Sequence, residues 1–148
     1  MNMSKETLPN NTIEFIKQLI PQREPMIMVD AIIHYEESRV KAELTVKQEN
    51  IFVQDHELTE PGLLEHMAQT VALYTGYEFY LKNETPPTGY IGSMKSVEIY
   101  ALPQCGETVE TTACILHEIM GVTLVHIEAC VGDQLIAKGE MKTVIAED

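Results

Sequence analysis

The segment PGLLEHMAQTVALYTGYEFYL, residues 61–81, is the strongest indication of the fold in the sequence. Its apolar residues recur mostly three or four positions apart, which is the spacing of one face of an α-helix. Pro61 suits the first turn of such a helix, and either Thr59 or Glu60 can cap it. Small and apolar residues dominate the whole segment, so we expect neighbouring structure to cover both sides of this long helix. The apolar positions at helical spacing are Leu64, Met67, Ala68, Val71 and Leu73.

The segments on either side of this helix predict strands, because many of them alternate apolar and polar residues. Before the helix, we predict one strand over residues 26–35 and another over 39–46. After it, the loop at residues 85–89 leads to four further predicted strands. These strands lie near residues 92–100, 109–115, 125–131 and 136–145. Gly121 and the pair Gly132-Asp133 separate the last three, where hairpin turns are expected.

A short helix precedes the strands. Asn11 or Thr12 can cap it, and it runs through Leu19 and is ended by Pro21. The sequence therefore predicts an α+β fold: an antiparallel sheet of five to six strands wrapped around one long central helix, with a short N-terminal helix. Such a sheet buries its apolar face against the helix. We expect residues 1–11 to be a polar tail and 12–148 to form a single domain, which a chain of 148 residues suits.

Composition excludes several classes of function. The net charge of −13 argues against binding to nucleic acid or to anionic lipid, both of which require a basic surface. The three cysteines form no CxxC pair, which is typical of reduced thiols and excludes a zinc ribbon. The histidines and carboxylates also show no pair with the spacing of metal ligands. The first eleven residues lack the apolar core of a signal peptide. We therefore expect a cytoplasmic protein with neither a membrane nor a metal partner.

Several stretches, in this order along the chain, resemble a known family. IPQREPMIMVD at residues 20–30 is similar to the LPHRxPMLLVD opening of hot-dog-fold 3-hydroxyacyl-ACP dehydratases, and EHMAQT at 65–70 resembles the E-x-x-AQ start of their central helix. VALYTGY at 71–77 is similar to the sequences of the family branch associated with aryl-polyene and flexirubin-type pigments. Residues 89–107 resemble the family motif G-I-x-x-x-x-F-x-x-P-V-x-P-G-D, which leads into the next strand. Two departures stand out. Gln22 replaces a usual His, and DHEL at 55–58 replaces the Gly-His-Phe-Pro signature of the catalytic loop.

Dehydration of a 3-hydroxyacyl thioester requires a base for the C2 proton, an acid for the departing C3 hydroxyl and a group that polarises the thioester carbonyl. The resemblance implies this activity, with His56 as the base and Glu65 as the acid or water-orienting partner. Gly62 lies near the helix start, where free backbone N–H groups can polarise the carbonyl. The resemblance also implies that His56 and Glu65 come from opposite subunits of a dimer. This scheme needs no cofactor.

Further residues are candidates for binding substrate. Gln69 lies four residues after Glu65 on the same helix face and can hydrogen-bond its carboxyl. Met67 and Met94 can line an acyl tunnel with pliable side chains, although Met most often packs in the core. His66 adjoins Glu65, but neighbouring helical residues do not face each other, so we expect His66 at a dimer interface or in solvent.

Two other functions stay open. An acyl-thioester hydrolase on the same fold would use Glu65 to activate water and would not need His56. A non-catalytic hot-dog subunit would pair with an active dehydratase and supply only structure or carrier docking.

The expected partner is an acyl carrier protein, bound by a homodimer, a higher homo-oligomer or a heteromer. Because the carrier is acidic, docking on this acidic chain needs a local basic patch. Candidates for that patch are Arg23, Lys82, Lys95 and Lys138.

Overall fold

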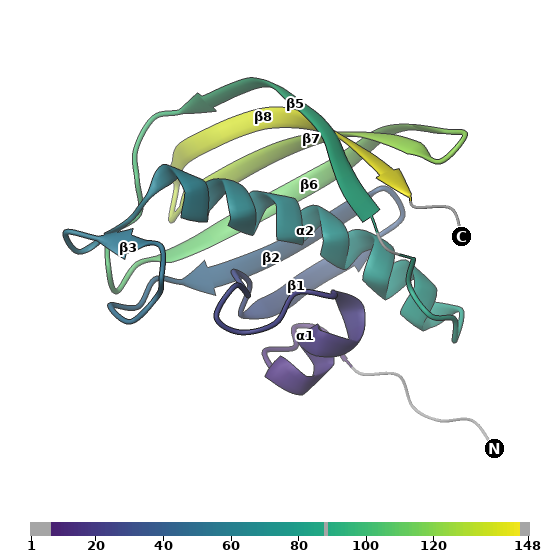
Figure 1. The fold of residues 1–148 in the computed structure, drawn as a ribbon, viewed down its shortest axis with the longest axis horizontal. Coiled ribbons are helices and arrows are strands. Elements are labelled where there is room, and N and C mark those ends of the chain that lie inside the picture. Colours follow the sequence, from purple (N-terminus) through teal and green to yellow (C-terminus); the bar gives the residue numbers. More distant parts are fainter. Residues whose placement is uncertain (1–6, 88, 146–148) are drawn as a thin grey trace.

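The computed structural model describes residues 7–87 and 89–145. Within them the chain runs through a short helix, two strands, a small hairpin, a long helix and four long strands (Figure 1). In this described part no helix is long and apolar enough to cross a membrane. The elements are α1 (Ile13–Leu19), β1 (Ala31–Glu36), β2 (Arg39–Thr45), β3 (Val53–Gln54), β4 (Glu57–Leu58), α2 (Glu60–Leu81), β5 (Gly89–Ile99), β6 (Thr108–Ile119), β7 (Val122–Val131) and β8 (Gln134–Ile145).

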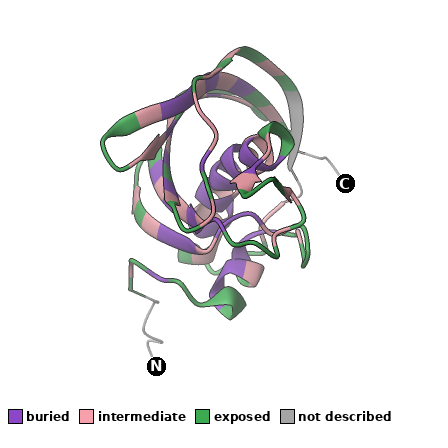
Figure 2. Cartoon of the chain, turned by 90° about the vertical axis from the view of Figure 1, so that its left-hand side faces the viewer, coloured by how far each residue is buried: buried purple, intermediate pink, exposed green. Residues whose placement is uncertain are grey.

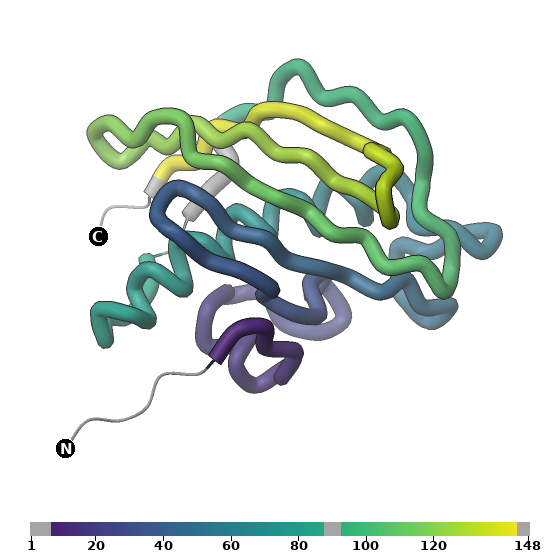
Figure 3. Tube along the Cα trace, turned by 180° about the vertical axis from the view of Figure 1, so that it is seen from behind, coloured from purple at the N-terminus to yellow at the C-terminus, as the bar shows by residue number. Residues whose placement is uncertain are grey.

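The described strands form two antiparallel sheets. The larger sheet has the order β1-β2-β6-β7-β8-β5, and β3 pairs with β4 in the smaller one. The larger sheet curls around α2, which lies against its concave face (Figure 1), and the view from behind shows the convex outer face (Figure 3). The predicted antiparallel sheet wrapped around one long helix is confirmed, with six strands among the described residues.

The long helix is covered on most of its circumference, as its composition predicted. It begins at Glu60, with Thr59 as the N-cap residue and Pro61 in the first turn. Buried residues run from Gly62 to Tyr77 along α2, and Figure 2 shows buried positions both on the helix and along the strands around it. The alternating strands supply the facing half of the core. Their fully buried apolar residues include Val40, Ala42, Val109, Ala113, Val125, Ile127 and Ala137.

The first strand begins at Ala31, later than the predicted start at residue 26. The reason is that helix side chains occupy the backbone groups of the preceding segment. The Met28 N–H donates to Gln69 Oε1, and the Met28 carbonyl accepts from His66. A backbone bound in this way cannot join a strand ladder at the same groups. The apolar run that resembled a strand is therefore a segment bound to α2.

The segment before α2 contains a small hairpin that the sequence did not predict. Its turn consists of Asp55 and His56, whose φ angles are 53° and 64°. Two successive residues with positive φ are typical of a type I′ turn, whose twist matches that of a two-stranded ribbon. The hairpin leads directly into Thr59 and the start of α2.

A close approach between the two helices positions the segment that follows α1. A Cβ atom added at Gly76 of α2 would lie 2.1 Å from the carbonyl oxygen of Leu19. Only glycine allows the backbone at the end of α1 to come this near. The contact places Leu19, Pro21 and Gln22 beside the exposed flank of α2, where a pocket opens.

Candidate active site

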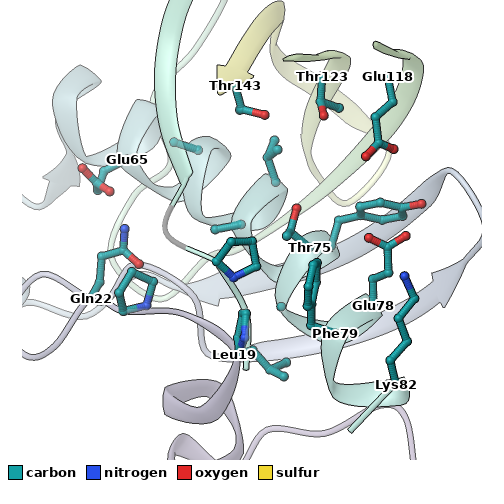
Figure 4. A pocket seen from close by; sticks show the side chains of 18 residues that line it. Leu19, Gln22, Glu65, Thr75, Glu78, Phe79, Lys82, Glu118, Thr123 and Thr143 are labelled. Carbon is teal, nitrogen blue, oxygen red and sulfur yellow. The ribbon is translucent and has the colours of Figure 1, made fainter. Parts of the chain in front are cut away.

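A pocket of about 500 Å³ runs along the flank of α2. Its walls come from α2, from the segment after α1, from Pro86 and Pro87, and from the ends of β6, β7 and β8. Figure 4 shows Glu65 and Gln22 at one end and Glu78, Lys82 and Glu118 at the other. Glu65 and Glu78 lie thirteen residues apart on one helix, which corresponds to about 20 Å. The pocket is therefore elongated, with a carboxyl group near each end.

Glu65 is partly buried in the second turn of α2 and lines the pocket. Its Oε2 accepts a hydrogen bond of 2.9 Å from Gln69 Nε2. The hydrogen bond that the four-residue spacing predicted is therefore present. Glu65 is the one predicted catalytic side chain among the residues that line this pocket within the described structure.

The Gln69 amide has a fixed orientation. The Met28 N–H, which can only donate, binds Gln69 Oε1 at 2.7 Å. Gln69 Nε2 therefore carries the two donors, which bind the Met26 carbonyl at 2.8 Å and Glu65 Oε2 at 2.9 Å. The Gln69 hydrogen bond therefore engages Oε2 of Glu65 rather than Oε1.

His66 lies on the other side of the helix and is fully buried. Its Nδ1 donates to the Met28 carbonyl at 2.7 Å, because a carbonyl only accepts, and its Nε2 accepts from the Thr111 hydroxyl at 2.8 Å. Burial lowers the pKa of His66 to about 4, and the hydrogen bond to Met28 opposes this shift. The expectation that His66 reaches a dimer interface or solvent is wrong, because polar partners inside the chain satisfy both ring nitrogens.

The buried His66 makes the stability of the fold depend on pH. Its pKa is about 4 in the folded chain, compared with 6.5 for an ordinary His, so the unfolded chain binds this proton first as the pH falls. The contribution of the neutral His66 side chain to the free energy of unfolding is complete above pH 6.5, decreases as the pH falls and is lost at about pH 4. This difference in pKa corresponds to a loss of about 3 kcal/mol in the free energy of unfolding.

We expect this loss to appear as a difference between the wild type and His66→Gln, whose amide can still donate to Met28 and accept from Thr111. Carboxylates that titrate in the same range contribute equally to both proteins, so the subtraction removes them. Urea unfolding at pH 7.5 and at pH 4 measures the difference, and the wild type should lose about 3 kcal/mol relative to the variant. A difference that stays constant with pH would show that His66 does not titrate in this way.

His56 lies at the exposed turn of the β3–β4 hairpin. Its Nδ1 lies 2.8 Å from Gln48 Oε1, and its carbonyl accepts from the backbone N–H of Cys105 at 2.8 Å. The pocket lining includes Glu65 but not His56. The described chain therefore does not bring the two predicted catalytic side chains into one pocket.

The family model described as ApeP-like, ApeP dehydratase, matches residues 14–148. The chain belongs to the ApeP-like dehydratase family. Among curated proteins, the 3-hydroxyacyl-ACP dehydratase FabZ from Ralstonia nicotianae is 28% identical over 142 residues, which cover 92% of this chain and 87% of FabZ.

Solved structures agree with this fold. A chain of the dehydratase heterocomplex ApeI:P from Xenorhabdus doucetiae matches with a TM-score of 0.85 at 16% identity, covering 97% of this chain and 94% of that one. A sigma28-regulated virulence protein from Campylobacter jejuni matches with a TM-score of 0.70 at 14% identity, covering 90% and 96%. The hot-dog fold that the sequence motifs implied is thus shown for this ApeP-like dehydratase.

The other predicted site residues of this ApeP-like dehydratase lie outside the pocket lining. Gly62 is buried in the first turn of α2, and a Cβ atom there would lie 2.5 Å from the Cβ atom of Phe52. Its N–H group belongs to the helix start, where amides have no partner within the helix. Met67 is fully buried in the core, and Met94 is partly buried on β5.

The basic residues proposed for carrier docking in this ApeP-like dehydratase have different surroundings. Lys95 and Lys138 lie on β5 and β8, each within 4.0 Å of a glutamate carboxylate, which offsets part of their charge. Arg23 donates to the carbonyls of Ile20, Gln22 and Lys17 at the end of α1. Lys82 lines the pocket, with its Nζ 5.4 Å from the centre of the Phe79 ring. Of the four, only Lys82 belongs to the lining of this pocket.

Sequence reasoning missed Gln22 as a pocket residue of this ApeP-like dehydratase. Gln22 lines the pocket beside Glu65 (Figure 4), although the sequence marked it only as a departure from the opening motif. That departure was the available signal, because a motif position with a changed polar side chain is a candidate for altered contacts. Its location in the pocket depends on the contact between Gly76 and Leu19, which no local pattern predicts.

Proposed function

We propose that this dehydratase-family chain converts a 3-hydroxyacyl thioester, carried on acyl carrier protein, into the 2-enoyl thioester and water. The observation that carries this proposal is Glu65 on the wall of an elongated pocket, with Oε2 engaged by Gln69 and Oε1 left to act. The curated relative FabZ supports the substrate class. The sequence similarity to the aryl-polyene branch favours pigment synthesis as the setting, and three free cysteines fit the cytoplasm.

In this scheme a base takes the C2 proton, and the electron pair of the C–H bond forms the C2–C3 double bond as the C3–O bond breaks. Glu65 delivers its Oε1 proton to the departing hydroxyl, which leaves as water. The Gly62 N–H at the helix start polarises the thioester carbonyl and stabilises the negative charge that develops on its oxygen. The pocket flank that carries Glu65 also holds the acyl chain.

His56 is the base in this proposal, and it comes from the second subunit of a dimer. Its exposed position at the β3–β4 turn, outside the pocket lining of its own chain, supports this arrangement. An imidazole at an exposed turn can reach the pocket of a neighbouring chain, and neutral imidazole is a suitable base near pH 7.

A complementation experiment tests the shared site. We expect His56→Ala and Glu65→Gln each to lose dehydration of a 3-hydroxyacyl carrier protein. When the two variants are unfolded together and refolded as a mixture, about half of the dimers are mixed, and each mixed dimer has one intact site of its two. Activity should therefore return to about a quarter of the wild-type value. Wild-type turnover by His56→Ala, or no recovery on mixing, would contradict the two-subunit arrangement.

A second candidate function is that of a partner subunit in a heteromer. The observations that favour it are the exposed His56 without the Gly-His-Phe-Pro signature and the structural match to a chain of a heterocomplex. In this case the purified chain alone produces no enoyl thioester, and activity appears only when a second hot-dog chain is added. Free carrier thiol as the product would instead indicate hydrolysis of the thioester.

A further inference from the structure

The Gln22 side chain lies in the pocket without the partners that a structural amide has. Its Oε1 is buried and makes no hydrogen bond to the described residues, whereas its amide nitrogen points toward Glu65 (Figure 4). Among the described buried side-chain atoms, this oxygen is the one unsatisfied case. A buried acceptor without a partner lowers stability, and an apolar side chain of similar size would avoid that cost. An amide at this position therefore does not stabilise the fold.

The backbone around Gln22 is held firmly in place. The Arg23 guanidinium donates to the carbonyls of Ile20 and Gln22 at 2.9 and 2.7 Å. Glu24 forms an ion pair of 2.9 Å with Lys17 of α1, and Gly76 admits the Leu19 carbonyl against α2. The amide is thus presented to the pocket by a preorganised segment, which is the arrangement that ligand binding favours.

We propose that Gln22 binds the C3 hydroxyl group of the substrate beside Glu65. This inference rests on the proposed function. The Gln22 Nε2–H donates to the hydroxyl oxygen, and Glu65 Oε1 supplies the proton to the same oxygen when the C3–O bond breaks. The oxygen gains negative charge as it departs, so a second donor on it stabilises the transition state as well as the bound substrate.

The consequence is selectivity for the oxygen at C3. A site with a polar group that matches a substrate hydroxyl discriminates against the analogue that lacks it, because the protein group then stays unpaired. One hydrogen bond of this kind corresponds to about a tenfold difference in affinity. We therefore expect the chain to bind a 3-hydroxyacyl carrier protein about tenfold more tightly than the saturated acyl carrier protein of the same length.

The test measures both dissociation constants in the Glu65→Gln background, where we expect turnover to be about a hundredfold slower or more, with and without Gln22→Met. We expect the ratio of the two constants to fall from about ten to about one in Gln22→Met, and to fall in the same direction in Gln22→Asn, whose amide is one methylene shorter. Gln18→Met, an exposed glutamine change on α1, is the matched control and should keep the ratio. Thermal unfolding of each variant verifies the fold.

An unchanged ratio in both Gln22 variants would overturn the inference, even if the chain with an intact Glu65 produces enoyl thioester. A wild-type chain that produces no enoyl thioester under any condition would instead contradict the proposed function. The two failures are therefore distinguishable. A ratio near one with Gln22 intact would also overturn the inference, since the hydroxyl would then make no net contribution to binding.

Discussion

Glu65→Gln should lower kcat for dehydration by about a hundredfold to a thousandfold, because the amide cannot deliver a proton to the leaving hydroxyl. The amide oxygen can still accept the hydrogen bond from Gln69 Nε2, so the network around Met26 and Met28 stays in place. The loss should therefore appear in kcat, with KM and the melting temperature close to those of the wild type. A continuous assay of enoyl thioester formation measures it.

Glu60→Gln is the matched control, since Glu60 is an exposed residue of the same helix and the substitution makes the same change from carboxyl to amide. It should keep kcat near the wild-type value. If the Glu65 variant retained most of the activity, or if both variants lost it equally, the acid would have to be another group. A general effect of charge on the helix start would then explain the result better than proton transfer.

Gly76→Ala should markedly lower the stability of the fold. The added Cβ atom would lie 2.1 Å from the oxygen and 2.8 Å from the carbon of the Leu19 carbonyl, and backbone atoms cannot rotate away as a side chain does. In a helix without such a contact, replacing Gly with Ala raises the free energy of unfolding by about 1 kcal/mol. We expect the clash to reverse that gain and to lower the free energy of unfolding by about 3 kcal/mol.

Urea unfolding measures this loss, and Gly139→Ala provides the comparison. A Cβ atom at Gly139 would lie 3.0 Å from a methyl group and 3.2 Å from the Cα atom of Val97, both farther away than the Leu19 carbonyl atoms are from a Cβ atom at Gly76, so its cost should be smaller. Gly76→Ala should also lower activity, because moving α1 displaces Gln22 and Pro21 from the pocket wall. A Gly76→Ala protein as stable as the wild type would show that the two helices can separate without cost.

The main elements were predictable because their signals are local. Pro61 and the helical spacing that follows it predicted α2, and the alternation of Val40, Ala42 and Leu44 predicted β2. The start of β1 was not predictable, because an apolar run has the same composition whether its backbone joins a sheet or binds helix side chains. The carbonyl of Met28 is bound by His66, which lies 38 residues away in the sequence.

The candidate site was predictable only in part for the same reason. Glu65 and Gln69 lie on one helix face, so their contact follows from spacing alone. The burial of His66 depends on Thr111 of β6, and the position of Gln22 depends on the packing of α1 on α2. The proposed base from a second subunit follows only from the family resemblance, because no local pattern in one chain predicts an interface between two.

We propose that Glu65 in this pocket delivers a proton to a leaving hydroxyl, so that water is eliminated from an acyl group that stays on its carrier. The most direct measurement is the intact mass of a 3-hydroxyacyl carrier protein before and after incubation with this chain, alone and with a second hot-dog subunit. We expect the carrier to lose the mass of one water and to keep its acyl group, and Glu65→Gln to prevent this change. A carrier that loses its whole acyl group, or that loses water equally with Glu65→Gln, would contradict it.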